Sequence, residues 1–205
     1  MNTVTAPLFS PASEWSGRND GPGPEHARWH STIDTASSPT AGAVHLIGFA
    51  SDEGVERNGG RQGAAKGPEA LRAALGSLAV HDEQLRIDAG TVTTQHDDLE
   101  GAQRELSDRV RDLVAAQGAS GMTVVLGGGH ETSFASHRGA YEALGLQVGD
   151  EHDDHSRQHR GDANRVSCAA SHRVDVAGEH IGLQLHVFQP INGSRGIVLK
   201  AIRQA

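Results

Sequence analysis

The chain contains little of several residue types, and each shortage excludes a class of protein. It has one cysteine, Cys168, in 205 residues, so no disulfide can form within it, which is typical of a reducing compartment. Aromatic residues make up 3% of the sequence, so a core must be built from Val, Leu, Ile and Ala. Lysine and arginine form no run and the net charge is −8, which argues against a nucleic-acid-binding surface.

No apolar run approaches the roughly 20 residues that a membrane-spanning helix needs. The amino terminus also lacks the basic head and apolar centre of a secretory signal. We therefore expect a cytoplasmic protein with no membrane and no nucleic-acid partner. Histidine is in excess, with 13 residues, and six of them fall between His152 and His186. Such a bias fits either metal binding or a poorly folded segment.

Apolar strand patterns alternate with helix patterns through the middle of the chain. We predict strands at 43–49, 85–90 and 122–126, and helices that begin at Pro68, at Asp97 or Asp98, and at Glu131. This alternation predicts a three-layer α/β fold with a mainly parallel sheet.

The pattern also divides the chain into three parts. We place an irregular arm at 1–41, the α/β domain at 42–149, and a degenerate or partly disordered continuation at 150–205. In the continuation a strand pattern recovers only at 181–188.

The segment VVLGGGHETSF, at 124–134, places three glycines and a histidine directly after a predicted strand. Functional residues of parallel sheets lie beyond the carboxyl ends of strands, and glycine lets the backbone approach another group closely. A phosphate is one candidate for that group. However, the dinucleotide pattern needs glycine where Thr132 stands, and the Gly-Lys-Ser/Thr of a Walker loop is absent. A metal ion is the second candidate.

An acidic cluster, DEHDD, begins twenty residues after His130. Asp150, His152 and Asp154 alternate along it, so that the two carboxylates project to one side with the imidazole between them. Hard divalent ions take carboxylate oxygens, and an imidazole keeps such a site suitable for Mn²⁺ or Zn²⁺. Taken alone, the same cluster is also typical of a solvated surface.

Three segments, in this order, resemble the ureohydrolases, the arginase and agmatinase superfamily. They are HLIGFASDEGVERNGGRQGAAKGPEALRAAL at 45–75, VVLGGGHE at 124–131 and the D-x-H-x-D at 150–154. The first of them, with EWSGRND at 14–20 and RWH at 28–30, is most similar to the formimidoylglutamase branch. The resemblance covers about residues 14–147, and the long loop motif is its most specific part.

The resemblance implies a pair of Mn²⁺ ions and hydrolysis of N-formimidoyl-L-glutamate to L-glutamate and formamide, in histidine degradation. His130 and Asp154 would bind one ion, Asp150 would bridge both, and His152 would bind the second. A hydroxide held by the metal would be the only catalytic group, since metal ions lower the pKa of bound water. Three cations of the 52–67 loop are candidates to hold the substrate carboxylates, or are ordinary surface charges: Arg57, Arg61 and Lys66.

The chain departs from the family after about residue 147. Members are longer and carry a later D-x-D, where Gln184 and His186 stand here. A neutral glutamine cannot bridge two cations as a carboxylate does. The alternatives to a formimidoylglutamase are an inactive ureohydrolase remnant, left by a deletion or frame disruption, and a related agmatinase-like or arginase-like enzyme. We expect a small-molecule amidine as substrate. The sequence leaves open whether the chain forms a homo-oligomer.

Overall fold

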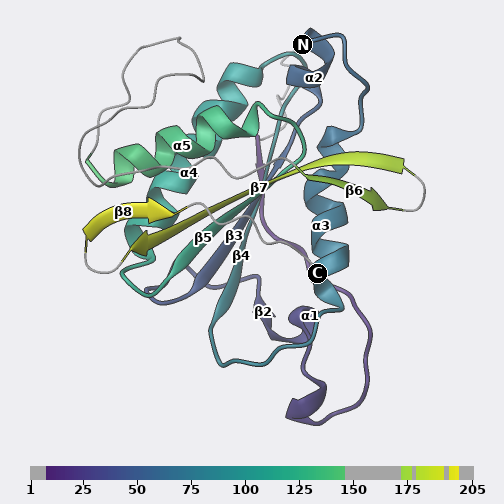
Figure 1. Ribbon diagram of the computed structural model, residues 1–205, viewed down its shortest axis with the longest axis vertical. Coiled ribbons are helices and arrows are strands. Elements are labelled where there is room, and N and C mark those ends of the chain that lie inside the picture. The colour runs from purple at the N-terminus through teal and green to yellow at the C-terminus, as the bar shows by residue number, and fades with distance from the viewer. Residues whose placement is uncertain (1–7, 146–171, 177–178, 192–193, 199–205) are drawn as a thin grey trace, which may run out of the picture.

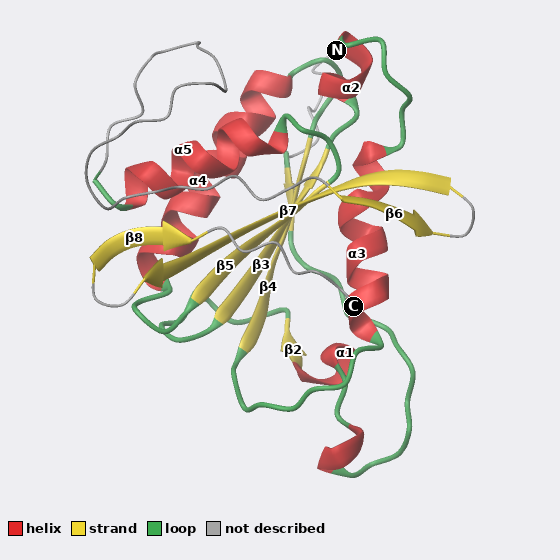
Figure 2. Cartoon of the chain, in the orientation of Figure 1, coloured by secondary structure: helices red, strands yellow, loops and turns green. Residues whose placement is uncertain are grey.

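Figure 1 shows the chain as a computed structural model. The structure describes residues 8–145, and beyond them the backbone of three strands at 172–176, 179–191 and 194–198. A twisted sheet crosses the centre of the molecule, and helices lie on both of its faces (Figures 1 and 2).

Three parallel strands form the centre of the sheet. They are β3 (Val44–Ala50), β4 (Arg86–Thr93) and β5 (Met122–Gly127), and β3 lies between the other two. At one edge, the short strands β1 (Phe9–Ser10) and β2 (Ile33–Asp34) pair with β4. Over these strands the order is β1-β4-β3-β5. The predicted parallel α/β sheet is therefore confirmed.

The strands at the other edge reverse direction. β7 (Glu179–Ile191) runs antiparallel to β5, and it pairs in turn with β6 (His172–Val176) and β8 (Ser194–Val198). The strand predicted at 181–188 is thus present.

Helices cover the two faces of the sheet and make the three predicted layers. On one face lie α4 (Leu99–Ala116) and α5 (Thr132–Ala143), packed against each other, and on the other lies α3 (Gly67–Gly76) (Figure 1). Among the described residues, no helix is long and apolar enough to cross a membrane.

Each face of the sheet has its own apolar core. Ile47 and Phe49 of β3 pack with the α4 and α5 face, where Leu106 and Val110 are fully buried. Leu46 and Leu126 face α3. Burying one such side chain contributes about 1.5–3 kcal/mol, so these alternating aliphatic residues hold the three layers together without many aromatics.

Local signals account for the helix ends. The carboxylate of Asp98 accepts a hydrogen bond from the Gly101 N–H at 2.8 Å, as an N-cap of α4 should. Gly118 and Gly145, just past α4 and α5, have φ of 65° and 68°, the left-handed conformation that glycine adopts readily. Pro68 lies in the first turn of α3.

The amino-terminal arm is tied to the sheet by its tryptophans. Trp15 donates from Nε1 to a carboxylate oxygen of Asp88 at 2.8 Å, and its ring stacks with Trp29 at 6.3 Å between centroids. The arm also contains α1 (Trp29–Thr32) and the 3-10 turn η1 (Pro24–His26). The three predicted domain boundaries stay predictions.

The segment at 52–67, predicted as a loop, contains two short helical turns. These are α2 (Glu53–Arg57) and the 3-10 turn η2 (Ala64–Lys66). The Asp52 carboxylate, just before α2, accepts hydrogen bonds from the N–H groups of Gly63 and Ala65 at the start of η2, at 2.9 and 3.0 Å. One side chain thereby closes the segment into a compact loop.

Candidate metal and substrate site

The two most specific sequence motifs meet at the carboxyl ends of β3 and β5. Because the strands are parallel and Phe49 pairs with Gly127, the segments that follow them leave the sheet side by side. We call residues 51–67 and 127–131 together the glycine corner. It lies where parallel α/β sheets place their functional loops.

The triglycine allows one half of the glycine corner to rest directly on the other. A Cβ on Gly128 would overlap the carbonyl group of Ala64 in η2, and a Cβ on Gly67 would lie 2.9 Å from the Gly127 carbonyl oxygen. Real side chains do not approach so closely, so backbone packs on backbone here. The group that approaches the triglycine in this structure is the chain's own loop.

His130 follows the triglycine and precedes α5. Its side chain is exposed, and its carbonyl accepts a hydrogen bond from the Ser133 N–H at 3.0 Å. The other three predicted ligands, Asp150, His152 and Asp154, lie outside the described residues. Within the described part of the chain, no three His, Cys, Asp or Glu side chains come together as a metal site.

Glu131 is a carboxylate in the middle of the glycine corner. One of its oxygens, Oε1, is buried and has no hydrogen-bond partner. Burial raises the pKa of Glu131, and the nearby charge of Asp52 raises it further. Hydrogen bonds from its own N–H, from the Gly54 N–H and from the Ser51 hydroxyl oppose that rise in pKa.

Arg57 contacts acidic groups at the start of α4. Its guanidinium donates to Glu53 at 2.8 Å, to Glu100 at 2.5 Å and to the carbonyl of Asp97 at 2.7 Å. The hydrogen bond to Glu100 is the main cause of a raised Arg57 pKa. This candidate for substrate binding therefore joins the loop to α4 in the structure. The other two candidates, Arg61 and Lys66, are exposed on the same loop.

The antiparallel strand β7 brings Gln184 and His186 beside β5. Gln184 pairs with Gly127 and His186 with Val125, so the backbone of Gln184 is next to the start of the triglycine. Nothing is described of their side chains. Their replacement of metal-binding aspartates stays a prediction.

Several residues of the glycine corner were not found from the sequence. The Asp52 carboxylate accepts from N–H groups eleven and thirteen residues on, and Gln103 of α4 donates to the Glu131 carbonyl at 3.0 Å. The only available signal was the run of small and acidic residues after β3, which a plain turn would also show.

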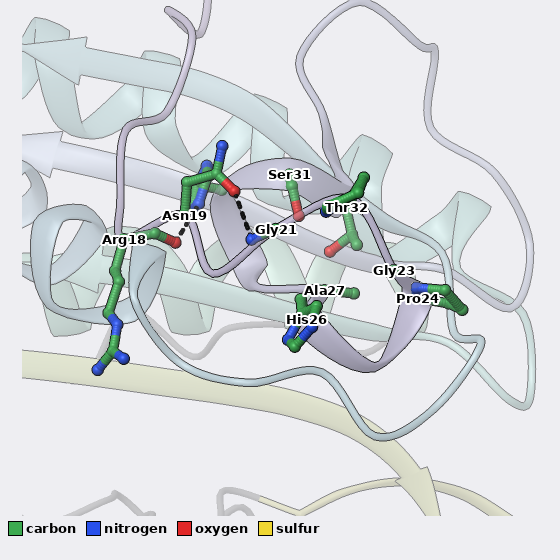
Figure 3. Close-up of a pocket in the computed structure, with 11 residues that line it drawn as sticks. Arg18, Asn19, Gly21, Gly23, Pro24, His26, Ala27, Ser31 and Thr32 are labelled. Atoms are coloured by element: carbon green, nitrogen blue, oxygen red, sulfur yellow. Dashed lines mark hydrogen bonds between the residues drawn. The ribbon is translucent and has the colours of Figure 1, made fainter.

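The WSGRND and RWH segments form a separate structure away from the glycine corner. His30 bonds through Nε2 to the Arg18 carbonyl at 2.9 Å, and Asp20 pairs with both Arg18 and Arg28. Figure 3 shows an open pocket of about 440 Å³ beside them, lined by residues that include Arg18, His26 and Thr32. Within the arm, these motifs bond to one another. They also pack on α3, because a Cβ on Gly76 would lie 2.5 Å from the carbonyl oxygen of Ser16.

The sequence model of the arginase family matches residues 42–189, which include the whole glycine corner. The chain belongs to the arginase family. Its three-layer α/β fold is the arginase fold, of which the structure covers part. A formimidoylglutamase of Corynebacterium efficiens is 49% identical over 133 residues, which are 64% of this chain and 41% of that relative.

Two further similar proteins carry related names. A formimidoylglutamase of Rhodococcus opacus is 44% identical over 137 residues, 66% of this chain and 42% of that protein. The crystal structure of Trypanosoma cruzi formiminoglutamase with Mn²⁺ is 32% identical, with a TM-score of 0.50, over 57% of this chain and 40% of that one. This arginase-family chain thus spans about two fifths of the length of the curated relatives it matches.

Proposed function

We propose that this chain belongs to a Mn²⁺-dependent formimidoylglutamase, which converts N-formimidoyl-L-glutamate to L-glutamate and formamide in histidine degradation. Water adds its oxygen to the formimidoyl carbon, the bond from that carbon to the glutamate nitrogen breaks, and the nitrogen takes up a proton. The relatives that carry this name support the reaction class.

The observation that carries the proposal is the packing within the glycine corner. The long loop and the GGGHE turn are far apart in the sequence. The carbonyl group of Ala64 nevertheless packs directly on Gly128, where no side chain would fit. Such packing holds the His130 turn at the carboxyl edge of the sheet, where catalytic groups of α/β enzymes are placed.

Two of the described residues support the proposal of a divalent cation at this position. His130 offers an exposed imidazole, and the neighbouring Glu131 has a buried carboxylate oxygen without a partner, so the local charge favours a cation. His130, Asp150, His152 and Asp154 would hold the ions. When bound, they would lower the pKa of water and polarise the amidine.

The loop would provide the cations that the two substrate carboxylates need. Arg61 and Lys66 are exposed on the loop that packs on the His130 turn, so either can meet a substrate carboxylate there. Arg57 would act through its ion pairs with Glu53 and Glu100, which hold the loop in place. This division assigns binding to Arg61 and Lys66 and loop placement to Arg57.

Formamide release is the direct test of this function. The purified chain, loaded with Mn²⁺, is incubated with N-formimidoyl-L-glutamate, and formamide and glutamate are measured together. Agmatine and arginine serve as alternative amidino substrates. Equal amounts of both products from the first substrate support the proposal, and urea from agmatine or arginine alone indicates the related amidinohydrolase.

A catalytically inactive remnant is the second candidate. It is favoured by Gln184 and His186, which stand in place of two aspartates. Metal stoichiometry separates the two: a pair of bound Mn²⁺ ions with turnover supports the enzyme, and one weakly bound ion or none without turnover supports the remnant.

We extend the proposal to partners and location. A small-molecule amidine, rather than a nucleic acid or a membrane, is the partner that the acidic net charge of −8 favours. The single cysteine suits the cytoplasm. Sedimentation would show whether the chain forms a homo-oligomer.

A further inference from the structure

Asp52 brings two distant backbone amides to one of its oxygen atoms. Its Oδ1 accepts hydrogen bonds from the Gly63 N–H at 2.9 Å and from the Ala65 N–H at 3.0 Å. Gly63 has a φ of 130°, a backbone conformation that glycine adopts readily, and a Cβ there would meet nothing within 4 Å. Glycine is therefore needed here for its conformation, which lets the two N–H groups converge on one carboxylate.

The peptide group that joins Ala64 to Ala65 is held from both sides. Its N–H bonds to Asp52, and its carbonyl packs on Gly128 of the triglycine. Because a trans peptide group is planar and its N–H and C=O point in opposite directions, the bond to Asp52 also fixes the direction of the carbonyl. One rigid unit thus connects the Asp52 carboxylate to the turn that carries His130.

Two further contacts keep the same segment in place. A Cβ on Gly67 would lie 2.9 Å from both the Gly127 carbonyl oxygen and the Gly128 Cα, so the backbone rests on the triglycine here too. The Lys66 N–H donates to the Gly63 carbonyl at 3.2 Å. Lys66, a candidate for substrate binding, is therefore part of the turn that Asp52 closes.

We propose that Asp52 is a positioning residue: through the Ala64–Ala65 peptide group, it holds the His130 turn in place in the glycine corner. Lys66, next in the chain, takes its position from the same bonds. The inference rests on the proposed function, because it concerns the geometry of that site. It also assigns both bonded amides to Asp52, so a substrate carboxylate would meet the cationic side chains of this loop rather than these amides.

Variants of the full chain separate the hydrogen bonds of Asp52 from its charge. Asp52→Ala removes both bonds, and Asp52→Asn keeps an acceptor oxygen at the same place. Asp34→Ala is the matched control: Asp34 is also half-buried, and its Oδ1 accepts from the N–H groups of Ala36 and Ser37, at 2.8 and 3.0 Å. Thermal unfolding checks that each variant folds, and Asp52→Ser, with its shorter side chain, takes the place of Asp52→Ala if that variant does not.

The first readout is amide hydrogen exchange, which needs no metal. We expect Asp52→Ala to speed exchange at Gly63 and Ala65 at least about tenfold, as loss of a hydrogen bond to a charged acceptor implies. The deciding amide is that of Ser133, which donates to the His130 carbonyl at 3.0 Å. It should exchange about fivefold faster, within the range of coupling between residues that share contacts. Asp52→Asn should restore most of the protection, and Asp34→Ala should leave all three amides at the wild-type rate.

Two results of the exchange experiment would overturn the proposal. Faster exchange confined to Gly63 and Ala65 would show that Asp52 closes its loop without acting on the His130 turn. Equal acceleration of the Ser133 amide in Asp34→Ala would show a general loss of stability instead.

The second readout is Mn²⁺ affinity by calorimetry. We expect about tenfold weaker binding in Asp52→Ala, recovery in Asp52→Asn and no change in Asp34→Ala, since groups that orient metal ligands change affinity about 10–100-fold. Unchanged affinity in Asp52→Ala overturns the positioning role. If the wild-type chain binds no Mn²⁺, the proposed function fails, and exchange at Ser133 alone decides whether Asp52 holds the His130 turn.

Discussion

Two carboxylates of this chain, one buried and one half-buried, lie in opposite electrostatic surroundings. Asp88 of β4 is 1% exposed in its side chain, and it accepts two bonds from Arg72, one from Trp15 and one from the Gly90 N–H. Glu131 has one buried oxygen with no partner and a second carboxylate nearby. Both side chains join distant segments, but only one is fully satisfied.

The difference separates a structural region from the region in which we propose the site. A buried ion pair loses hydration free energy when it forms, and removal of one partner leaves an uncompensated charge that destabilises the fold further. The pair therefore holds the arm, α3 and β4 in one arrangement. An incompletely bonded carboxylate beside an exposed histidine leaves capacity for a ligand. The glycine corner is therefore where a cation and substrate are expected, and the Asp88 region is where stability is expected.

Removal of Arg72 should give the largest loss of stability. Arg72→Met leaves Asp88 charged and buried, which costs about 3–5 kcal/mol of the free energy of unfolding. Urea denaturation measures it, with Arg104→Met, an exposed arginine of α4, as control. A loss no greater than that of the control would show that the Asp88 region is not the stabilising one.

Crowding of the triglycine should come next. Gly128→Ala places a Cβ on top of the Ala64 carbonyl, a backbone group that cannot swing away. The cost should therefore reach or exceed about 3 kcal/mol, the upper end of ordinary overpacking. The loop should also lose protection from proteolysis. Gly59→Asn is the control, because nothing lies within 4 Å of a Cβ there and asparagine tolerates its φ of 64°. Equal stability of the two variants would contradict the close packing.

The indole bond to Asp88 should matter less than the ion pair. Trp15→Phe keeps the ring stack but loses the Nε1 donor, at a cost of about 1.5–3 kcal/mol for a bond to a charged group. Trp29→Phe keeps an aromatic ring in the stack and leaves the Trp15 bond to Asp88 in place, so it should cost less. Thermal unfolding compares the pair, and a larger effect in Trp29→Phe would count against the assignment.

The smallest expected effect is a pH dependence from His45. This side chain is fully buried, and its Nε2 accepts from the Thr40 N–H at 3.0 Å, which requires the neutral ring. Burial lowers the pKa of His45 in the folded chain. At acidic pH the unfolded chain therefore binds more protons than the folded chain. The stability that the neutral His45 contributes is present above the ordinary histidine pKa of about 6.5, and it is lost as the pH falls below that value.

A His45→Gln variant checks this sign. It should show a flatter fall in the unfolding free energy between pH 7 and pH 5 than the wild type, in urea titrations at several pH values. His81→Gln, at an exposed histidine, should leave the slope unchanged. A steeper slope in His45→Gln would contradict the assignment.

Local signals made much of the fold predictable. The apolar run of β3, Pro68 in the first turn of α3 and the Asp98 cap of α4 act over a few residues, so the sequence displays them directly. Contacts between distant residues were not visible in it. Asp52 closes its loop eleven and thirteen residues on, and Arg57 meets Glu100 43 residues away.

The candidate site was predictable only as a set of motifs. Glycines after β5 indicated a close approach, but the sequence could not show that Ala64 is the approaching group. For Glu131, no periodic pattern and no sequence spacing indicated a contact partner. Its place in the glycine corner depends on the parallel register of β3 and β5, which places both loops at one edge. Asp150, His152 and Asp154 stay predictions outside the described residues.

A calorimetric Mn²⁺ titration of the wild-type chain beside His130→Ala is the most direct test that the glycine corner is the metal site. His81→Ala is the exposed histidine control. The account predicts saturable binding that His130→Ala weakens at least tenfold and His81→Ala leaves unchanged. Binding of equal strength in all three proteins, or none in the wild type, would contradict it.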